Sequence, residues 1–210
     1  MTAHDSETER RILDAAHAVF LRRGTAGARM QEIADEAGVD KALLHYYFRS
    51  KDRLAAAVFQ RAARELFPFA VVTIASNLPL EEKVERFIHL YLDTIRRNPH
   101  LPGYILSELH HHPERAGQLL ETLVGRPAEG LAPPVLETLG AQIEERVRAG
   151  RMHPIAPEQF VLNLISLCIF PFAAKPLIQV LLGLDEGDFD RLIDERRTDL
   201  PGFFLRALRP

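Results

Sequence analysis

Cysteine and tryptophan are nearly missing from this chain: its 210 residues include one cysteine, Cys168, and no tryptophan. An intramolecular disulfide needs two cysteines, so the fold holds together without one. That composition fits a reducing cytosol, where disulfides rarely persist. The neighbours of Cys168, in the stretch ISLCIFPF, are almost all apolar. We therefore expect a buried thiol of low reactivity rather than a catalytic one.

A hydrophobic run long enough to cross a membrane is missing too. The longest apolar stretch, residues 160–174, contains Asn163, Ser166 and Pro171, and it falls short of the roughly 20 residues that a spanning helix needs. The N-terminus is polar and charged, without the apolar segment of a signal peptide. We expect a cytoplasmic protein with no membrane partner.

Familiar catalytic signatures are also missing. The sequence contains no Gly-x-Ser-x-Gly, no phosphate-binding P-loop, no Cys-x-x-Cys and no His-Glu-x-x-His. We expect neither an enzyme nor a cofactor.

Excess positive charge is absent as well, since the net charge is −3. The net charge of a whole chain does not show how charge is distributed over its faces. Because the chain as a whole is not basic, we expect any nucleic-acid binding to rest on a few well-placed residues.

Helical periodicity is present throughout, and we predict an all-α fold. The first helix is expected over residues 7–23, with Ser6 as N-cap and Glu9 as its capping-box partner, and Gly24 ends it. A longer helix opens at Lys51, with Ser50 as N-cap, and bridges two parts of the chain. Further helices are expected at 80–97, 102–112, 116–125 and 134–149, at 157–182 with kinks at Pro171 and Pro176, and at 188–208 with a break at Pro201.

The most informative stretch is MQEIADEAGVDKALLHYYFRSKDRL, residues 30–54. A short apolar-periodic segment stops at Gly38, which suits the left-handed position just past a helix end. Asp40 suits the N-cap of a second short helix. Segments of about two turns are not stable alone and need a third helix to cover them. Two short helices joined by a Gly turn and packed on a third make the helix-turn-helix unit that reads the DNA major groove.

Residues 7–54 resemble the DNA-binding domain of the TetR family of bacterial transcriptional regulators. The resemblance rests on RRILDAAHAVFLRRG and IADEAGVDKALLHYYFRSKDRL, which match nearly all of the family pattern. We accordingly divide the chain into a three-helix helix-turn-helix DNA-binding domain, residues 1–54, and a helical regulatory and dimerisation domain, residues 55–210. The resemblance implies a regulator, most simply a repressor, that a small molecule releases from a double-stranded DNA operator.

The predicted DNA contacts gather around the second short helix. Lys41 in its first turn is placed to reach base edges or phosphate, with a solvated surface lysine as the alternative. Ala42 permits close approach, and exposed Leu43 either meets a thymine methyl or is an ordinary surface leucine. Lys51 offers its ammonium and a helix N-terminus to a phosphate. The family usually has Tyr and often His where His45 and Tyr46 stand here, so their order is swapped. The predicted contact set is Arg29, Lys41, Ala42, Leu43, His45, Tyr46 and Lys51.

Arg29 departs from the family pattern, because that position often carries a hydroxyl residue. A longer, charged phosphate contact is expected in its place. Since one helix-turn-helix unit reads only a few base pairs, a homodimer on a palindrome is the usual solution. We expect the apolar segments 157–182 and 188–208 to form the dimer, as the resemblance implies a four-helix bundle from the last two helices of each subunit.

The middle of the chain is expected to sense an effector. Its aromatic residues either line a mostly apolar ligand pocket or are ordinary core. The predicted pocket residues are Phe67, Phe87, Tyr91, Tyr104, Phe170 and Phe172. Prolines 68, 171 and 176 would leave helix ends open to such a cavity.

An alternative is a metal- or protein-responsive DNA-binding regulator without a small-molecule pocket. Glu108 with His111 or His112 has the helical spacing that a metal needs, although a solvated helix end beside Pro113 is the simpler interpretation.

Overall fold

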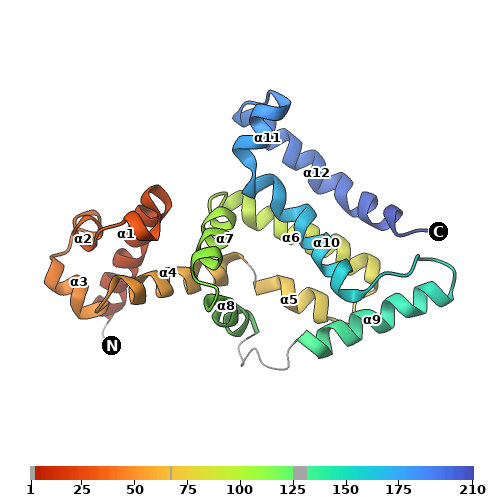
Figure 1. Ribbon diagram of the computed structural model, residues 1–210, viewed down its shortest axis with the longest axis horizontal. Helices are drawn as coiled ribbons and strands as arrows, with labels where there is room; N and C mark the ends of the chain where they lie inside the picture. The colour runs from red at the N-terminus through yellow and green to blue at the C-terminus, as the bar shows by residue number, and fades with distance from the viewer. Residues whose placement is uncertain (1–2, 67, 125–131) are drawn as a thin grey trace.

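The computed structural model describes residues 3–66, 68–124 and 132–210. These residues form helices and no strand, which confirms the all-α prediction (Figure 1). In chain order the helices are α1 (Ala3–Gly27), α2 (Met30–Ala37), α3 (Lys41–Tyr47), α4 (Lys51–Leu66), α5 (Pro68–Ala75), α6 (Leu80–Arg97), α7 (Leu101–His111), α8 (Arg115–Val124), α9 (Ala132–Arg148), α10 (Pro157–Ala173), α11 (Lys175–Leu182) and α12 (Glu186–Ala207).

Helices α1, α2 and α3 form a small unit at one end of the molecule (Figure 1). Its core is made by Ile12, Phe20, Ile33 and Leu44, each at most 2% exposed. Helix α1 starts at Ala3, so the prediction of Ser6 as its N-cap is wrong. No Gly or Pro interrupts residues 3–6, and the helix extends through them. The helix breaks at Gly24, whose φ is +68°, as the sequence predicts.

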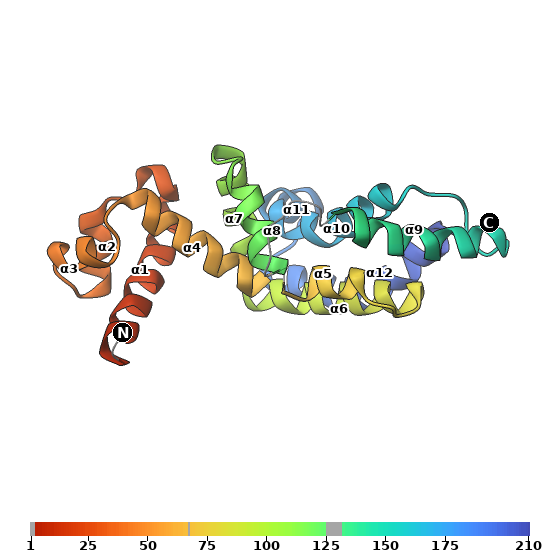
Figure 2. The same ribbon diagram turned by 90° about the horizontal axis from the view of Figure 1, so that it is seen from below.

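Helix α4 leaves this unit and runs into the rest of the chain, packing on α1 at one end and on α7 and α8 at the other (Figures 1 and 2). Its buried face includes Leu54, Val58, Phe59 and Ala62. The backbone N–H of Arg53 donates to the Ser50 hydroxyl oxygen over 3.2 Å, as expected of the predicted N-cap. The bridging helix is therefore fixed at both ends by packing.

The larger part of the molecule is built around α6, which packs against α5, α10 and α12. Figure 2 shows α5 and α6 along one side of this part and α9, α10 and α11 along the other. The buried face of α6 repeats every three or four residues: Leu80, Val84, Phe87, Ile88, Tyr91, Leu92 and Ile95. This face is the centre of the C-terminal core.

The prolines at the end of the chain follow the prediction in one place and depart from it in another. A 74° bend separates α10 from α11, close to the expected kinks at Pro171 and Pro176. Helix α12 instead continues through Pro201, so the predicted break there is wrong. One proline removes one backbone hydrogen bond, and the helix is held on both sides of it by buried Phe189, Ile193 and Phe204.

In the described part of the chain, no single helix is long and apolar enough to span a membrane. The bent pair α10 and α11 meets the requirement only by length and composition.

Candidate DNA interface

The turn between α2 and α3 has the geometry that its sequence predicts. Gly38 is left-handed, with φ +63°, and its N–H points back to the carbonyls of Ala34 and Asp35. The Asp40 carboxylate accepts from the backbone N–H of Leu43 over 2.6 Å. Together the two caps satisfy backbone groups at facing helix ends and set the direction of α3.

Helix α3 has one anchored side and one free side. Leu44 is fully buried and Phe48, just after the helix, is 7% exposed. On the other side Tyr46 is 78% exposed and Leu43 is 37% exposed. Lys41, Ala42 and His45 are exposed too. Because α3 lies at the extreme end of the molecule in both views, this free side has an unobstructed path to a partner (Figures 1 and 2).

Tyr47 and Lys51 make contacts inside the chain. Tyr47 is half-buried, and its hydroxyl donates to the Asp5 carboxylate over 3.3 Å. The ammonium of Lys51 donates to the carbonyls of Ala26 and Ala28, over 2.9 and 3.2 Å. An ammonium has three N–H groups, so one of them is left for a phosphate. Lys51 thus ties the α1–α2 connection to the first turn of α4.

Arg29 stands at the N-cap of α2 and is exposed. Its side chain makes no capping hydrogen bond to the helix. A hydroxyl residue in this place could cap the helix and still face DNA. The exposed arginine side chain is not used for capping, so its charge is available to a partner.

Arg11 is a positioning residue that sequence reasoning missed. Its Nη2 donates to the carbonyl of Ala37 over 2.6 Å and to that of Gly38 over 3.3 Å. The guanidinium therefore caps the C-terminal end of α2 from helix α1, where a cation is favoured. The only sequence signal was a basic pair, Arg10 and Arg11, and nothing local marks its partner 26 positions away.

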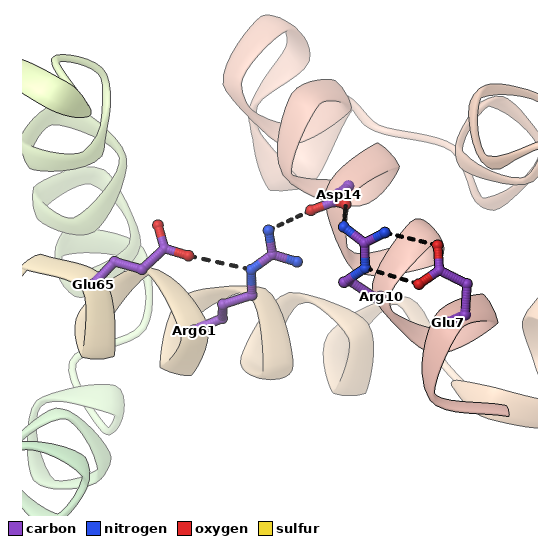
Figure 3. Close-up of polar contacts among 5 residues, drawn as sticks. All are labelled: Glu7, Arg10, Asp14, Arg61 and Glu65. Atoms are coloured by element: carbon purple, nitrogen blue, oxygen red, sulfur yellow. Dashed lines mark hydrogen bonds and ion pairs between the residues drawn. The ribbon is translucent and has the colours of Figure 1, made fainter. Parts of the chain in front are cut away.

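A row of charged side chains joins α1 to α4 on the surface, as Figure 3 shows. Arg61 of α4 contacts Asp14 of α1 and, over 3.3 Å, Glu65. Arg10 contacts Asp14 over 3.7 Å and Glu7 over 2.7 Å. All five side chains are at least a third exposed, so each pair stabilises the fold weakly. The row adds a direct α1–α4 contact to the packing beneath it.

The predicted pocket residues are dispersed. Phe87 and Tyr91 are buried and stacked, with ring centroids 5.3 Å apart. Tyr104 faces His17 of α1 instead, at 5.8 Å. Phe172 packs on Phe189 of α12, at 6.0 Å. These four belong to packed regions, and the structure does not bring them together around one hollow.

The remaining two predicted pocket residues are Phe170 and Phe67. Phe170 is 57% exposed on the outer side of α10, so it lines no interior pocket. Its neighbours Cys168, Pro171 and Phe172 take the inward positions. Phe67 lies outside the described residues. A surface hollow of about 500 Å³ lies between α5 and α6, and it is lined by Phe69, Val72, Thr73, Ser76, Leu78, Arg86 and Leu90.

The residues suggested for a metal are used otherwise. Glu108 turns inward and pairs with Arg115 of α8. His111 Nδ1 lies 2.8 Å from the carbonyl of Ser107, and His112 Nδ1 lies 3.2 Å from Glu114. Across the described residues, no group of three or more His, Cys, Asp or Glu side chains could hold an ion.

Sequence comparisons point to one family. Residues 12–58 match the model of bacterial regulatory proteins of the tetR family. An HTH-type transcriptional regulator of Mycobacterium tuberculosis (MT1294) is 31% identical over 191 residues, which are 88% of this chain and 81% of that one. The HTH-type transcriptional repressor SCO4008 of Streptomyces coelicolor is 34% identical over 125 residues, covering 55% of this chain and 61% of the repressor.

Solved structures agree with the fold. A TetR family transcription regulator from Marinobacter aquaeolei superposes with a TM-score of 0.67 at 18% identity, over 99% of this chain and 98% of that one. HlyIIR, a hemolysin II transcriptional regulator, gives a TM-score of 0.59 at 25% identity, over 98% and 99% of the two chains. The chain belongs to the TetR family of bacterial transcriptional regulators, and it is a DNA-binding regulator rather than an enzyme.

Proposed function

We propose that this regulator is a repressor that binds a palindromic operator as a homodimer in the cytoplasm, and that a small, largely apolar effector releases it. The observation that carries the proposal is the free side of α3. A helix anchored by buried Leu44 presents Lys41, Leu43 and Tyr46 to solvent at the tip of the molecule. A short recognition helix held this way fits the major groove.

Each contact has a physical role in this proposal. Lys41 and Arg29 neutralise phosphates, and Lys51 does so with the N–H that its two carbonyl partners leave free. Tyr46 donates its hydroxyl to a phosphate. Leu43 packs on a thymine methyl, His45 bonds to a base or a phosphate, and Ala42 lets the backbone approach the groove. Binding should therefore weaken steeply with salt.

The dimer is assigned to residues 157–182 and 188–208. These segments carry large apolar side chains that are at least 55% exposed in the single chain, and such a patch marks an interaction surface. The exposed residues are Leu162, Phe170, Leu177, Val180, Leu181, Leu182 and Phe203. A symmetric pair of chains would bury them and place two α3 helices on one operator.

Repression and effector release rest on fewer observations. The relative SCO4008 is named a transcriptional repressor. The surface hollow between α5 and α6 has a mostly apolar lining, and its volume of about 500 Å³ lies within the range of small-molecule sites. Arg86 at this hollow would favour an effector with an anionic group. A metal effector has less support, since Glu108 is already paired with Arg115.

Selection of bound DNA from a random pool tests the proposal. The expected result is an inverted repeat whose half-sites are about one helical turn apart, or a multiple of it. Direct repeats, or single half-sites, would contradict the dimer. No enrichment at low and at physiological salt would contradict sequence-specific binding altogether. Thermal shift of the chain with a panel of apolar acids, beside a metal panel with chelator, then separates the two effector classes.

A further inference from the structure

A buried ion pair lies where the helix-turn-helix unit meets the C-terminal helices. Glu108 of α7 is 4% exposed and Arg115 of α8 is 5% exposed. The Arg115 guanidinium donates to Oε2 of Glu108. The other oxygen, Oε1, accepts from the hydroxyl of Thr25, which belongs to the short helical end of α1 beyond the Gly24 break. One carboxylate therefore joins three helices.

A fourth helix meets the same group. The Arg115 guanidinium carbon lies 6.0 Å from the centre of the Phe59 ring on α4. We call Thr25, Phe59, Glu108 and Arg115 the Glu108 junction. Helix α4 also packs on both α7 and α8. The Thr25–Glu108 hydrogen bond thus joins α1 to α7 at the point where α4 packs on α7 and α8.

The connection continues from Thr25 toward the DNA-reading surface. The carbonyl of Ala26, next to Thr25, accepts from the Lys51 ammonium over 2.9 Å, and that of Ala28 over 3.2 Å. Lys51 is the first residue of α4, and only residues 48–50 separate it from the end of α3. A displacement of Glu108 would therefore act on the α1–α2 connection and, through Lys51, on the base of the helix-turn-helix unit.

Stability alone does not explain such a pair. Removing two charges from water costs about as much as their attraction returns, and apolar residues of similar size often serve the core better. A buried pair does fix geometry, because either partner left alone is strongly unfavourable. The Asp14–Arg61 contact also joins α1 to α4 (Figure 3), but those side chains are 45% and 34% exposed, so water competes for them.

We propose that the Glu108 junction fixes the orientation of the helix-turn-helix unit relative to the C-terminal helices and carries movements of α7 and α8 to α1. The claim that the junction fixes the orientation of the helix-turn-helix unit rests on the fold alone. The effect on operator affinity rests in addition on the proposed function, and it is measured separately.

The test uses Thr25→Val, which removes the hydroxyl and keeps the shape, and Thr25→Ser, which keeps the hydroxyl. Thr94→Val is the control, since it makes the same change at a buried threonine inside α6 that is not part of the Glu108 junction. Spin labels are placed at Gln31→Cys on α2 and Glu145→Cys on α9, both exposed. Cys168 is buried and stays unlabelled. Labelled chains are diluted with unlabelled chains, so that only distances within one chain are recorded without DNA.

The distance between the two labels should show one narrow distribution in the otherwise unchanged chain, in Thr25→Ser and in Thr94→Val. Thr25→Val should give a broad distribution while its helix content stays unchanged. A narrow distribution for Thr25→Val, or equal broadening in Thr94→Val, would overturn the proposal.

On a selected operator, Thr25→Val should bind about fivefold more weakly, because an unrestrained unit must be ordered on binding. Broadening without weaker binding would overturn only the effect on affinity.

Discussion

At the scale of single residues, side chains within α3 and those around it differ in how well the sequence predicts them. Lys41, Leu43 and Tyr46 sit on a short helix whose apolar side is obvious, so their exposure follows from the 3.6-residue period. Lys51 is different, because its two carbonyl partners lie more than 20 positions earlier in the chain. Its role inside the fold comes from tertiary packing, which no local pattern encodes.

His17 provides a residue-scale prediction about pH. Its ring is half-buried beside Tyr104, and its Nε2 has no hydrogen-bond partner among the described residues. Burial lowers its pKa; Glu65 and Asp14 raise the pKa, while Arg61 and His100 lower it further. Folding therefore favours the neutral ring. Its contribution to stability is complete above the unfolded pKa of about 6.5 and is lost as pH falls below that value.

The melting temperature should accordingly fall between pH 7.5 and 5.5, and His17→Phe should reduce that fall. His153→Phe is the control, because His153 is exposed. Differential scanning fluorimetry at a series of pH values is sufficient. Parallel pH profiles for the unchanged chain and His17→Phe would show that the buried ring does not titrate on unfolding.

At the scale of helices, ends that depend on backbone conformation were predicted well. Gly38, Asp40 and Ser50 each occupy the cap that their chemistry favours. Ser6 and Pro201 were misjudged for opposite reasons. Ser6 is a residue type that favours an N-cap, but α1 starts earlier, at Ala3. Pro201 is a residue type that breaks helices, but α12 continues through it because buried neighbours hold the helix on both sides.

Gly38→Ala tests the turn at this scale. A side chain at φ +63° is strained, and the new Cβ would lie 3.1 Å from Nη2 of Arg11. We expect the free energy of unfolding to fall by about 1–2 kcal/mol, measured by urea denaturation. Gly117→Ala in α8 is the matched control, since its Cβ meets nothing within 4 Å, and it should be neutral or slightly stabilising. Equal effects of the two changes would refute the role of the turn.

At the scale of the whole molecule, the sequence predicts the class of fold and the helix order, and it misses how distant helices meet. Thr25 and Glu108 are 83 positions apart, and nothing near either one indicates their contact. The predicted pocket residues are dispersed for a similar reason, because an aromatic residue looks alike in the sequence whether it is stacked in the core, as Phe87 is, or exposed, as Phe170 is. Only packing separates these cases.

The dimer belongs to this scale. Phe203 of α12 is 55% exposed and Leu162 of α10 is 57% exposed. Phe203→Glu and Leu162→Glu should each convert a dimer to a monomer at micromolar concentration, measured by light scattering, because the charge would be buried unpaired at the interface. Leu120→Glu, on α8, is a control at another exposed leucine and should leave the mass unchanged. A monomeric unchanged chain would itself disprove the assignment.

The central claim is that the free side of α3 contacts the operator, and one comparison tests it most directly. Lys41→Ala and Arg148→Ala each remove one exposed cation, so they change the net charge equally and differ only in place. Binding to the selected operator is measured by fluorescence anisotropy at several salt concentrations. Lys41→Ala should bind about tenfold more weakly with a salt slope reduced by about one, and Arg148→Ala should match the unchanged chain. Equal affinities for the two variants would contradict recognition through α3.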